Sequence, residues 1–174
     1  MRHLSDWSVL GDWIGKQVLP EWDMPYGPMP YLTGLPDTMS FGSKKALTAA
    51  AANYGCPMLW AEGHSAAPPL ALDDNGHFSP PEGGWQGTLR FTQEDLDQRY
   101  DELAPKGQVD LVVIGCPQAS LEELRLTAAA LENHMEEGRT VPNHRLWVFT
   151  SGENYAVAEA EGTVQLLERG GALL

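Results

Sequence analysis

The stretch that decides the fold is Asp110-Leu-Val-Val-Ile-Gly115-Cys116-Pro-Gln-Ala-Ser120-Leu-Glu-Glu123. The apolar run that ends at Gly115 is typical of a buried strand in a parallel sheet. The pattern after Ser120 predicts a helix with carboxylates in its first turn. We therefore expect a strand over 109–114 and a helix over 120–135. This order places Cys116 and Ser120 between a strand's carboxyl end and a helix N-terminus, where open α/β sheets bind ligands and anions.

Further strands and helices alternate on both sides of this stretch. A helix is expected over 43–54 and a short strand over 57–61, and after the central helix a strand over 145–150, a helix over 154–169 and a final strand over 172–174. Alternation of this kind argues for parallel strands joined by right-handed crossovers. The predicted fold is therefore α/β, with a mostly parallel sheet in a three-layer α/β/α arrangement.

The first half of the chain is expected to pack onto the same domain. Residues 1–42 are predicted to form a helix followed by a segment rich in proline and aromatic residues. Residues 62–87 have no regular period and predict a long loop. After a short strand over 88–91, Thr92 and Asp95 form a capping box that opens a helix. We expect one domain over 1–174.

Composition excludes several classes of function. The chain has 174 residues and a formal net charge of −13, so a nucleic acid or an anionic membrane surface would be repelled. Its two cysteines do not make a disulfide framework. No apolar run approaches the ~20 residues that span a bilayer, and the first residues lack the apolar core of a signal peptide. We expect a cytoplasmic protein that binds neither nucleic acid nor membrane.

The candidate site residues follow the predicted strands. As ligand-binding residues we expect Glu62, Ser65, Gly115, Ser120, Thr150 and Ser151. Because the carboxyl ends of parallel strands share one edge, these groups could converge on a small anionic metabolite. The alternative is that they are ordinary turn and capping residues. No catalytic residue is identified, because no hydrolytic triad, phosphate loop or dinucleotide fingerprint occurs.

The residues leave three possible roles open for Cys116. It could be a metal thiolate, a nucleophile or an inert packed thiol. A single cysteine does not make a zinc or iron–sulfur site, which needs further thiolates or histidines. We therefore expect no cofactor to be held by the isolated chain.

The segment Gly115-Cys116-Pro117-Gln118-Ala119-Ser120 resembles the signature of the aconitase X large-subunit family, which usually reads Gly-Cys-Pro-His-x-Ser. Further segments match the family in the same order, namely 10–15, 45–55, 58–63, 146–151 and 164–170. The resemblance implies an aconitase-type domain related to dehydratases (hydro-lyases) that act on hydroxy acids, including cis-3-hydroxyproline and phosphomevalonate. It also implies an iron or iron–sulfur centre held by cysteines, with Cys116 as the metal ligand of this chain.

The chain departs from the family pattern at the positions that carry chemistry. Trp60 stands where the family has the first histidine of its His-x-Glu-Gly motif, and Gln118 replaces the histidine after Cys-Pro. The family's other cysteines and its small swivelling partner are absent from the sequence. We therefore expect a stand-alone, degenerate domain that is non-catalytic. It would bind a small hydroxy acid or phosphate, or act as an assembly module.

Two alternatives stay open at this stage. The first is a partial hydro-lyase, completed by partner chains that supply the missing iron ligands. The second is a structural homo-oligomer, since an isolated domain of this kind would expose apolar surface. The sequence leaves open whether the chain is an enzyme, and we expect either a homo-oligomer or a partner subunit.

Overall fold

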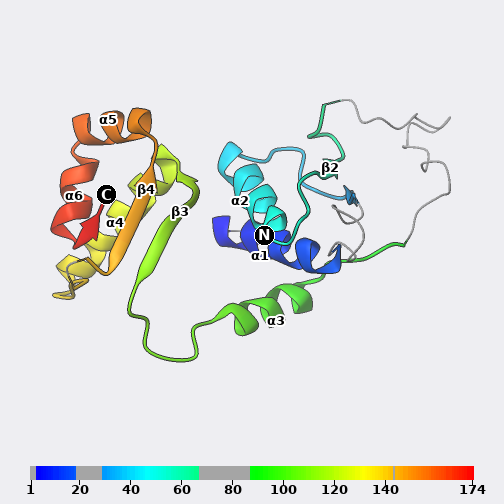
Figure 1. Cartoon of the computed structure of the whole chain (residues 1–174), viewed down its shortest axis with the longest axis horizontal. Helices are drawn as coiled ribbons and strands as arrows, with labels where there is room; N and C mark the ends of the chain where they lie inside the picture. Colours follow the sequence, from blue (N-terminus) through cyan, green and yellow to red (C-terminus); the bar gives the residue numbers. More distant parts are fainter. Residues whose placement is uncertain (1–2, 19–28, 67–86, 143) are drawn as a thin grey trace. The chain divides into compact units, whose positions relative to one another are not determined.

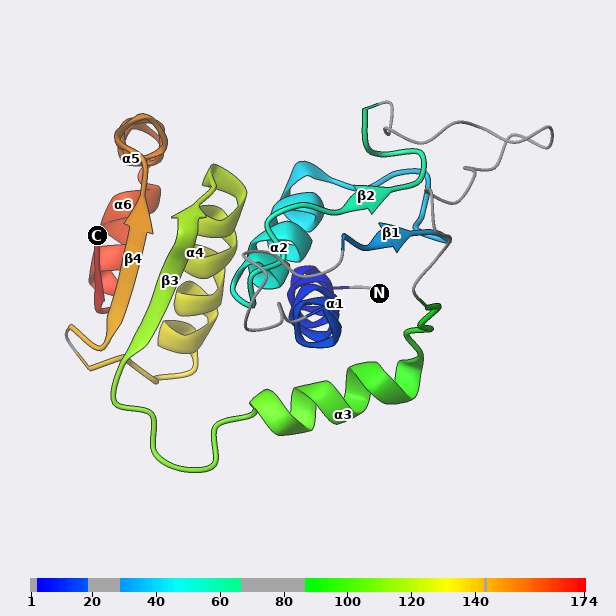
Figure 2. The same ribbon diagram turned by 45° about the vertical axis from the view of Figure 1, so that its right-hand side comes forward.

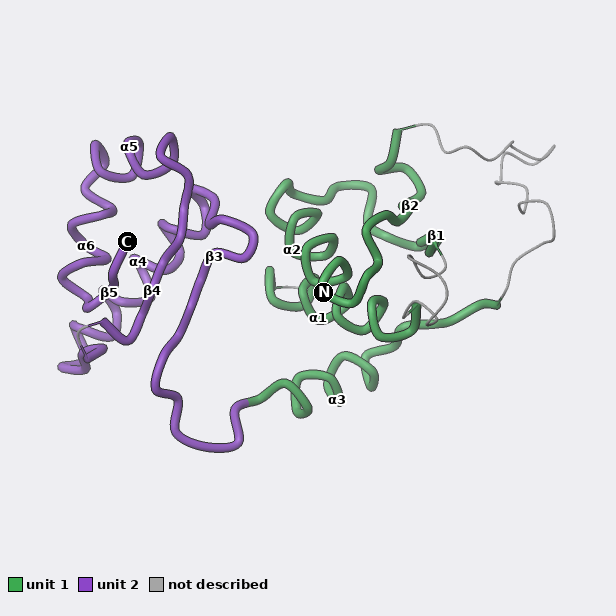
Figure 3. The backbone as a smooth tube through the Cα atoms, viewed as in Figure 1, with its two compact units in different colours: residues 1–104 green, residues 105–174 purple. Residues whose placement is uncertain are grey.

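The computed structural model describes residues 3–18, 29–66, 87–142 and 144–174. The chain divides into two compact units, residues 1–104 and residues 105–174, which Figure 3 draws in different colours. Each unit is described by itself below. That the whole chain forms one domain stays a prediction.

The first unit is built on two helices in close contact. Helix α1 (Leu4–Gln17) packs against α2 (Phe41–Ala52), and two buried glycines of α1 lie at this contact. A Cβ atom on Gly11 would overlap the carbonyl oxygen of Leu47 and lie 3.0 Å from the Cβ of Ala50. A Cβ on Gly15 would lie 2.9 Å from the carbonyl oxygen of Ala51. The glycines and the alanine-rich face of α2 together let the two backbones approach closely.

A small apolar core and a third helix complete this unit. Trp7, Leu10, Ile14 and Leu47 form the buried cluster, and the rings of Trp13 and Phe91 meet edge to face at 5.2 Å beside it. Helix α3 (Gln93–Leu103) packs on α1 and begins with the predicted capping box. Strands β1 (Tyr31–Leu32) and β2 (Trp60–Ala61) form a short parallel pair.

The second unit carries the parallel sheet that the sequence predicts. Its elements follow one another as β3 (Val112–Ala119), α4 (Leu121–Glu136), β4 (Leu146–Thr150), α5 (Gly152–Ala160), α6 (Thr163–Arg169) and β5 (Ala172–Leu173). The strands are parallel in the order β3-β4-β5. Figures 1 and 2 show β3 and β4 side by side, with their arrows pointing the same way. The predicted α/β class with parallel strands is confirmed.

The helices of this unit bury one face of the sheet. Leu146 and Val148 of β4 point into a core that also contains buried residues of the helices, namely Leu124, Ala128, Leu131, Ala158, Val164 and Leu167. The period of these residues along α4 is the helical one on which the sequence prediction depended. All of this burial lies on the side of the sheet that α4, α5 and α6 cover.

The opposite face of the sheet is apolar and exposed. Val113, Trp147 and Leu173 lie side by side in register across β3, β4 and β5, and Phe149 is the next residue of β4 on the same side. Their exposed fractions are 53%, 37%, 45% and 53%, respectively. We call Val113, Trp147, Phe149 and Leu173 the apolar sheet face. It explains why the sequence of β4 reads as continuously apolar although only every second side chain is buried.

Three predicted elements differ from the structure. Strand β3 does not stop before Gly115 but continues to Ala119, with an irregularity in its pairing to β4 between Ile114 and Ala119. The helix expected over 154–169 is two helices, because Gly162, with φ of +83°, ends the first and caps the second. Residues 88–91 do not form the predicted strand. Most of the predicted 62–87 loop lies outside the described residues.

None of the helices in the described ranges combines the length and the apolar character that crossing a bilayer requires.

Candidate functional site

The polar residues at the ends of β3 and β4 come together at one edge of the second unit. Ala119 and Thr150 are register partners, so the residues that follow them, Ser120 and Ser151, begin neighbouring helices at the same edge. The structure thus brings together Ser120, Thr150 and Ser151, as parallel strand direction requires. Their joint role as ligand-binding residues stays a prediction.

The hydroxyl groups at this edge are already used to hold the backbone. The Oγ of Ser120 accepts a hydrogen bond from the N–H of Glu123 at 3.3 Å and donates one to the Glu123 carboxylate at 2.8 Å. The Oγ of Ser151 accepts from the N–H of Asn154 at 3.2 Å. Thr150 donates to the carbonyl oxygen of Ala119 at 2.6 Å. These contacts fasten α4 and α5 to the ends of the strands.

The N-terminus of α4 also carries its own anion. One carboxylate oxygen of Glu123 accepts hydrogen bonds from both the N–H and the hydroxyl of Ser120, at 2.7 and 2.8 Å. This carboxylate therefore neutralises the helix dipole, and it would repel a second anion brought to the same helix end. Carboxylate and hydroxyl form the reciprocal capping box that the Ser-x-x-Glu spacing encodes.

We expect Ser120→Ala to lower the free energy of unfolding by about 1 kcal/mol. The substitution removes both hydrogen bonds of the Ser120 hydroxyl and, within the capping box, leaves the Glu123 carboxylate bound only to the backbone N–H of residue 120. Urea denaturation followed by circular dichroism measures this loss. Thr140→Ala, at an exposed residue outside the helices, is the control and should change stability by less than about 0.5 kcal/mol. Equal stabilities of the two variants would contradict a capping role for Ser120.

Gly115 and Cys116 lie within β3 rather than beyond its end. Gly115 has φ of +131°, and a Cβ there would lie 2.5 Å from the carbonyl oxygen of Phe149, so only glycine fits this irregular part of the strand. Cys116 carries an exposed thiol. Among the residues that the structure describes, no group of three or more histidine, cysteine, aspartate or glutamate side chains could hold a metal ion. These residues therefore do not fit an iron–sulfur centre bound by this chain alone.

Glu62 and Ser65 lie in the first unit, just after β2. The Oγ of Ser65 accepts a hydrogen bond from the N–H of Ala61 at 2.9 Å, and the N–H of Glu62 donates to the carbonyl oxygen of Leu32 at 2.9 Å. Burial, followed by the negative charge of Glu62, raises the pKa of Tyr31 on β1. These contacts stabilise the turn after β2. The convergence of Glu62 and Ser65 with the residues of the second unit stays a prediction.

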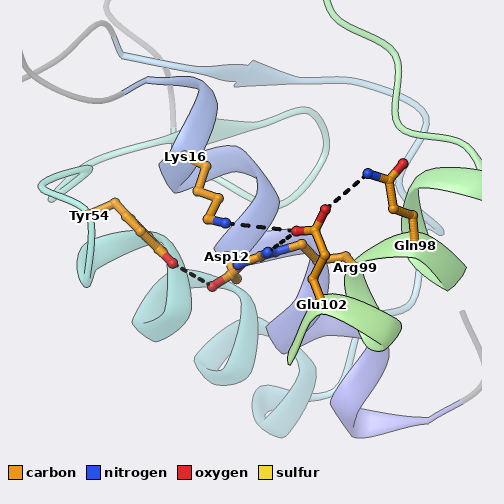
Figure 4. Close-up of polar contacts among 6 residues, drawn as sticks. All are labelled: Asp12, Lys16, Tyr54, Gln98, Arg99 and Glu102. Atoms are coloured by element: carbon orange, nitrogen blue, oxygen red, sulfur yellow. Dashed lines mark hydrogen bonds and ion pairs between the residues drawn. The ribbon is translucent and has the colours of Figure 1, made fainter. Parts of the chain in front are cut away.

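The first unit holds a polar cluster that sequence reasoning missed (Figure 4). Arg99 of α3 is buried, with 8% of its side chain exposed, and forms ion pairs with Asp12 of α1 and Glu102 of α3. Tyr54, just after α2, donates a hydrogen bond to Asp12 at 3.0 Å. Lys16 lies 3.9 Å from the Glu102 carboxylate. We call Asp12, Lys16, Tyr54, Arg99 and Glu102 the Arg99 cluster.

The charges of the Arg99 cluster are paired with one another within the first unit. Its hydrogen bond to Asp12, chiefly, raises the pKa of Arg99, and the same carboxylate raises the pKa of Tyr54. Hydrogen bonds from Gln98 and then Arg99 lower the pKa of Glu102. Two cations balance two carboxylates, so no charge is left over to bind a ligand. The cluster instead joins α3 and the end of α2 to α1.

Sequence could have suggested only the local part of this cluster. The i,i+3 spacing of Arg99 and Glu102 on a predicted helix is a recognised pairing distance. The contact between Asp12 and Arg99, by contrast, joins residues 87 positions apart, and no local pattern signals it.

Comparison with known proteins relates the second unit to one family. Residues 109–174 match the aconitase X third domain. Over 74 residues the chain is 38% identical to the phosphomevalonate dehydratase large subunit of Aeropyrum pernix, an alignment that covers 42% of this chain and 17% of that protein. The chain thus spans less than a fifth of the length of this curated relative.

A solved structure supports the fold. The crystal structure of Thermococcus kodakaraensis aconitase X in its holo-form matches with a TM-score of 0.66 and 21% identity, over 98% of this chain and 39% of that chain. The family model and the curated relative confirm the resemblance to the aconitase X family that the Gly115–Ser120 segment indicates.

Proposed function

Residues 109–174 of the chain match the aconitase X third domain, and on this premise we propose that the chain is a non-catalytic assembly module. The proposal is based on the hydroxyl groups at the ends of β3 and β4, which form hydrogen bonds within the fold. Ser120 donates its hydroxyl proton to the Glu123 carboxylate, and Thr150 donates its own to the carbonyl oxygen of Ala119. Because a hydroxyl has a single proton to donate, neither group is left to donate to a substrate, and we assign this edge to holding the fold together.

The lack, among the described residues, of a group of metal-binding side chains around Cys116 also supports a non-catalytic role. A hydro-lyase of the aconitase type needs a metal to polarise the leaving hydroxyl, and a single thiolate does not bind iron firmly enough to do so. The expected iron or iron–sulfur centre would need ligands from another chain.

Iron content and turnover together test the proposal. We expect the full chain, purified without oxygen and incubated with iron and sulfide, to retain no stoichiometric iron and to show no dehydration of phosphomevalonate. Cys116→Ala is the matched variant, and it should give the same iron content as the natural chain. Bound iron that disappears in Cys116→Ala, together with measurable dehydration, would overturn the non-catalytic role.

A second candidate function is favoured by the identity with the phosphomevalonate dehydratase large subunit. In this alternative the chain is one part of a hydro-lyase, and Cys116 supplies one ligand to a centre that partner chains complete. In the presence of the partner chains that complete the centre, this alternative requires the natural chain to retain iron and Cys116→Ala to lose it.

A further inference from the structure

The apolar sheet face is the feature of the second unit that its own fold leaves unexplained. Parallel sheets are covered on both faces in nearly all proteins, because both sets of side chains are apolar. Here helices cover the side that carries Leu146 and Val148, whereas Trp147 and Phe149 remain exposed on the other. An exposed apolar patch of several neighbouring side chains marks an interaction surface.

The aromatic pair at the centre of this face is held in place before any partner binds. The indole N–H of Trp147 donates a hydrogen bond to the carbonyl oxygen of His144 at 2.9 Å. The rings of Trp147 and Phe149 meet edge to face, with centroids 6.4 Å apart. A pre-oriented pair loses little side-chain entropy on binding, and aromatic residues of this kind are the usual anchors of protein interfaces.

The charge distribution of the unit favours a second copy of the chain as the partner. The apolar sheet face consists of uncharged side chains, and the exposed carboxylates of Glu132, Glu159 and Glu168 lie on the helices that cover the opposite side. Two copies could therefore meet face to face without opposing carboxylates, despite the net charge of −13. Just before β3 and β4, Asp110 and Arg145 form an exposed pair of opposite charges 3.9 Å apart. Across a two-fold axis, Asp110 of one copy could pair with Arg145 of the other.

The size of the face agrees with this partner. With the exposed Leu111, which lies two residues before Val113, each copy offers on the order of 450 Å² of apolar surface. Two copies would bury about 900 Å², close to the non-polar share of a standard interface of about 1,600 Å². Face-to-face contact of two sheets is also an established packing mode for apolar sheet surfaces.

We infer that the chain forms a two-fold symmetric dimer through the apolar sheet face, with Trp147 and Phe149 at its centre. This inference rests on the proposed assembly role and names the partner as a second copy of the chain. Because the core of the contact is apolar and the long-range charge is repulsive, added salt should strengthen the dimer rather than weaken it.

Sedimentation of the full chain between about 1 and 100 µM tests the inference, a range that spans micromolar affinity. We expect the mass to rise with concentration from 19.0 kDa to twice that value, and to rise further with sodium chloride. Phe149→Lys should raise the dissociation constant by at least about 30-fold, as loss of a central aromatic anchor does. Val113→Lys, tested in parallel, should act in the same direction at a second position.

Leu126→Lys is the matched control, because Leu126 is an equally exposed apolar residue (56%) but lies on α4, away from the face. It should leave the dissociation constant unchanged. A chain that stays monomeric at every concentration would overturn the inference, as would equal effects of Phe149→Lys and Leu126→Lys. Circular dichroism establishes that each variant is folded, and if Phe149→Lys is not, Val113→Lys decides the outcome. Failure here is distinct from failure of the non-catalytic role, which the iron content and turnover decide.

Discussion

Replacing Arg99 with methionine is expected to lower the free energy of unfolding of the first unit by about 3–5 kcal/mol, the cost of removing one partner from a buried ion pair. Methionine keeps most of the side-chain volume but leaves the carboxylate of Asp12, 15% exposed, with Tyr54 as its hydrogen-bond donor. The contact between α1 and α3 then loses its charge compensation. Chemical denaturation followed by tryptophan fluorescence measures the loss, since Trp7 and Trp13 lie beside this contact.

Lys16→Met is the matched control for this variant. Lys16 is a second cation on the same carboxylate, Glu102, but its side chain is 40% exposed and lies 3.9 Å away. An exposed ion pair of this kind contributes at most about 1 kcal/mol. Similar losses in the two variants would show that burial does not set the strength of the Arg99 cluster.

A change in pH should act on the same cluster with a definite sign. The pKa of Glu102 is lower in the folded chain than its ordinary value of 4.5. A carboxyl of this kind stabilises the fold above its unfolded pKa, and the contribution is lost as the pH falls through the lower, folded value. The stability difference between the natural chain and Arg99→Met should therefore narrow in acid.

The second large effect is expected at Gly11. In an isolated helix, alanine stabilises the helix by about 1 kcal/mol relative to glycine. Here, however, the Cβ of an alanine would overlap the carbonyl oxygen of Leu47. The obstacle is backbone, so relief requires α1 and α2 to separate. We expect Gly11→Ala to destabilise the first unit by about 3 kcal/mol or more, the upper range of overpacking. Thermal unfolding followed by circular dichroism measures it.

Gly152→Ala provides the control for this substitution. Gly152 is also helical, at the start of α5, and a Cβ there would meet no atom within 4 Å. Alanine should therefore be neutral or slightly stabilising at this position. Equal thermal stabilities of Gly11→Ala and Gly152→Ala would contradict the close approach of α1 to α2 at Gly11.

These two sites show how far local sequence reasoning reaches. The alanine-rich helix was visible in the sequence. Which partner it would pack against was not visible, since Gly11 and Leu47 meet only in the folded chain. The Arg99 cluster was missed for the same reason, because its central contact joins distant helices.

The candidate site divides in the same way. The capping boxes at Thr92 and Ser120 follow from residue type and spacing alone, and both are present. That the hydroxyl of Thr150 would be bound to the carbonyl oxygen of Ala119, rather than left for a ligand, depended on the register of β3 and β4. A strand that ran on to Ala119 set that register, and the glycine within it had suggested an earlier end.

By itself the sequence determined the alternation of strands and helices in the second unit, although not the break between α5 and α6, together with the parallel direction of the strands and the family likeness of residues 109–174. These are local properties, fixed by side-chain period, caps and apolar runs. Only the tertiary structure decided that the helices bury one face of the sheet and leave Trp147 and Phe149 exposed on the other. A continuous apolar strand has the same sequence whether one or both of its faces are covered, because what covers it comes from elsewhere.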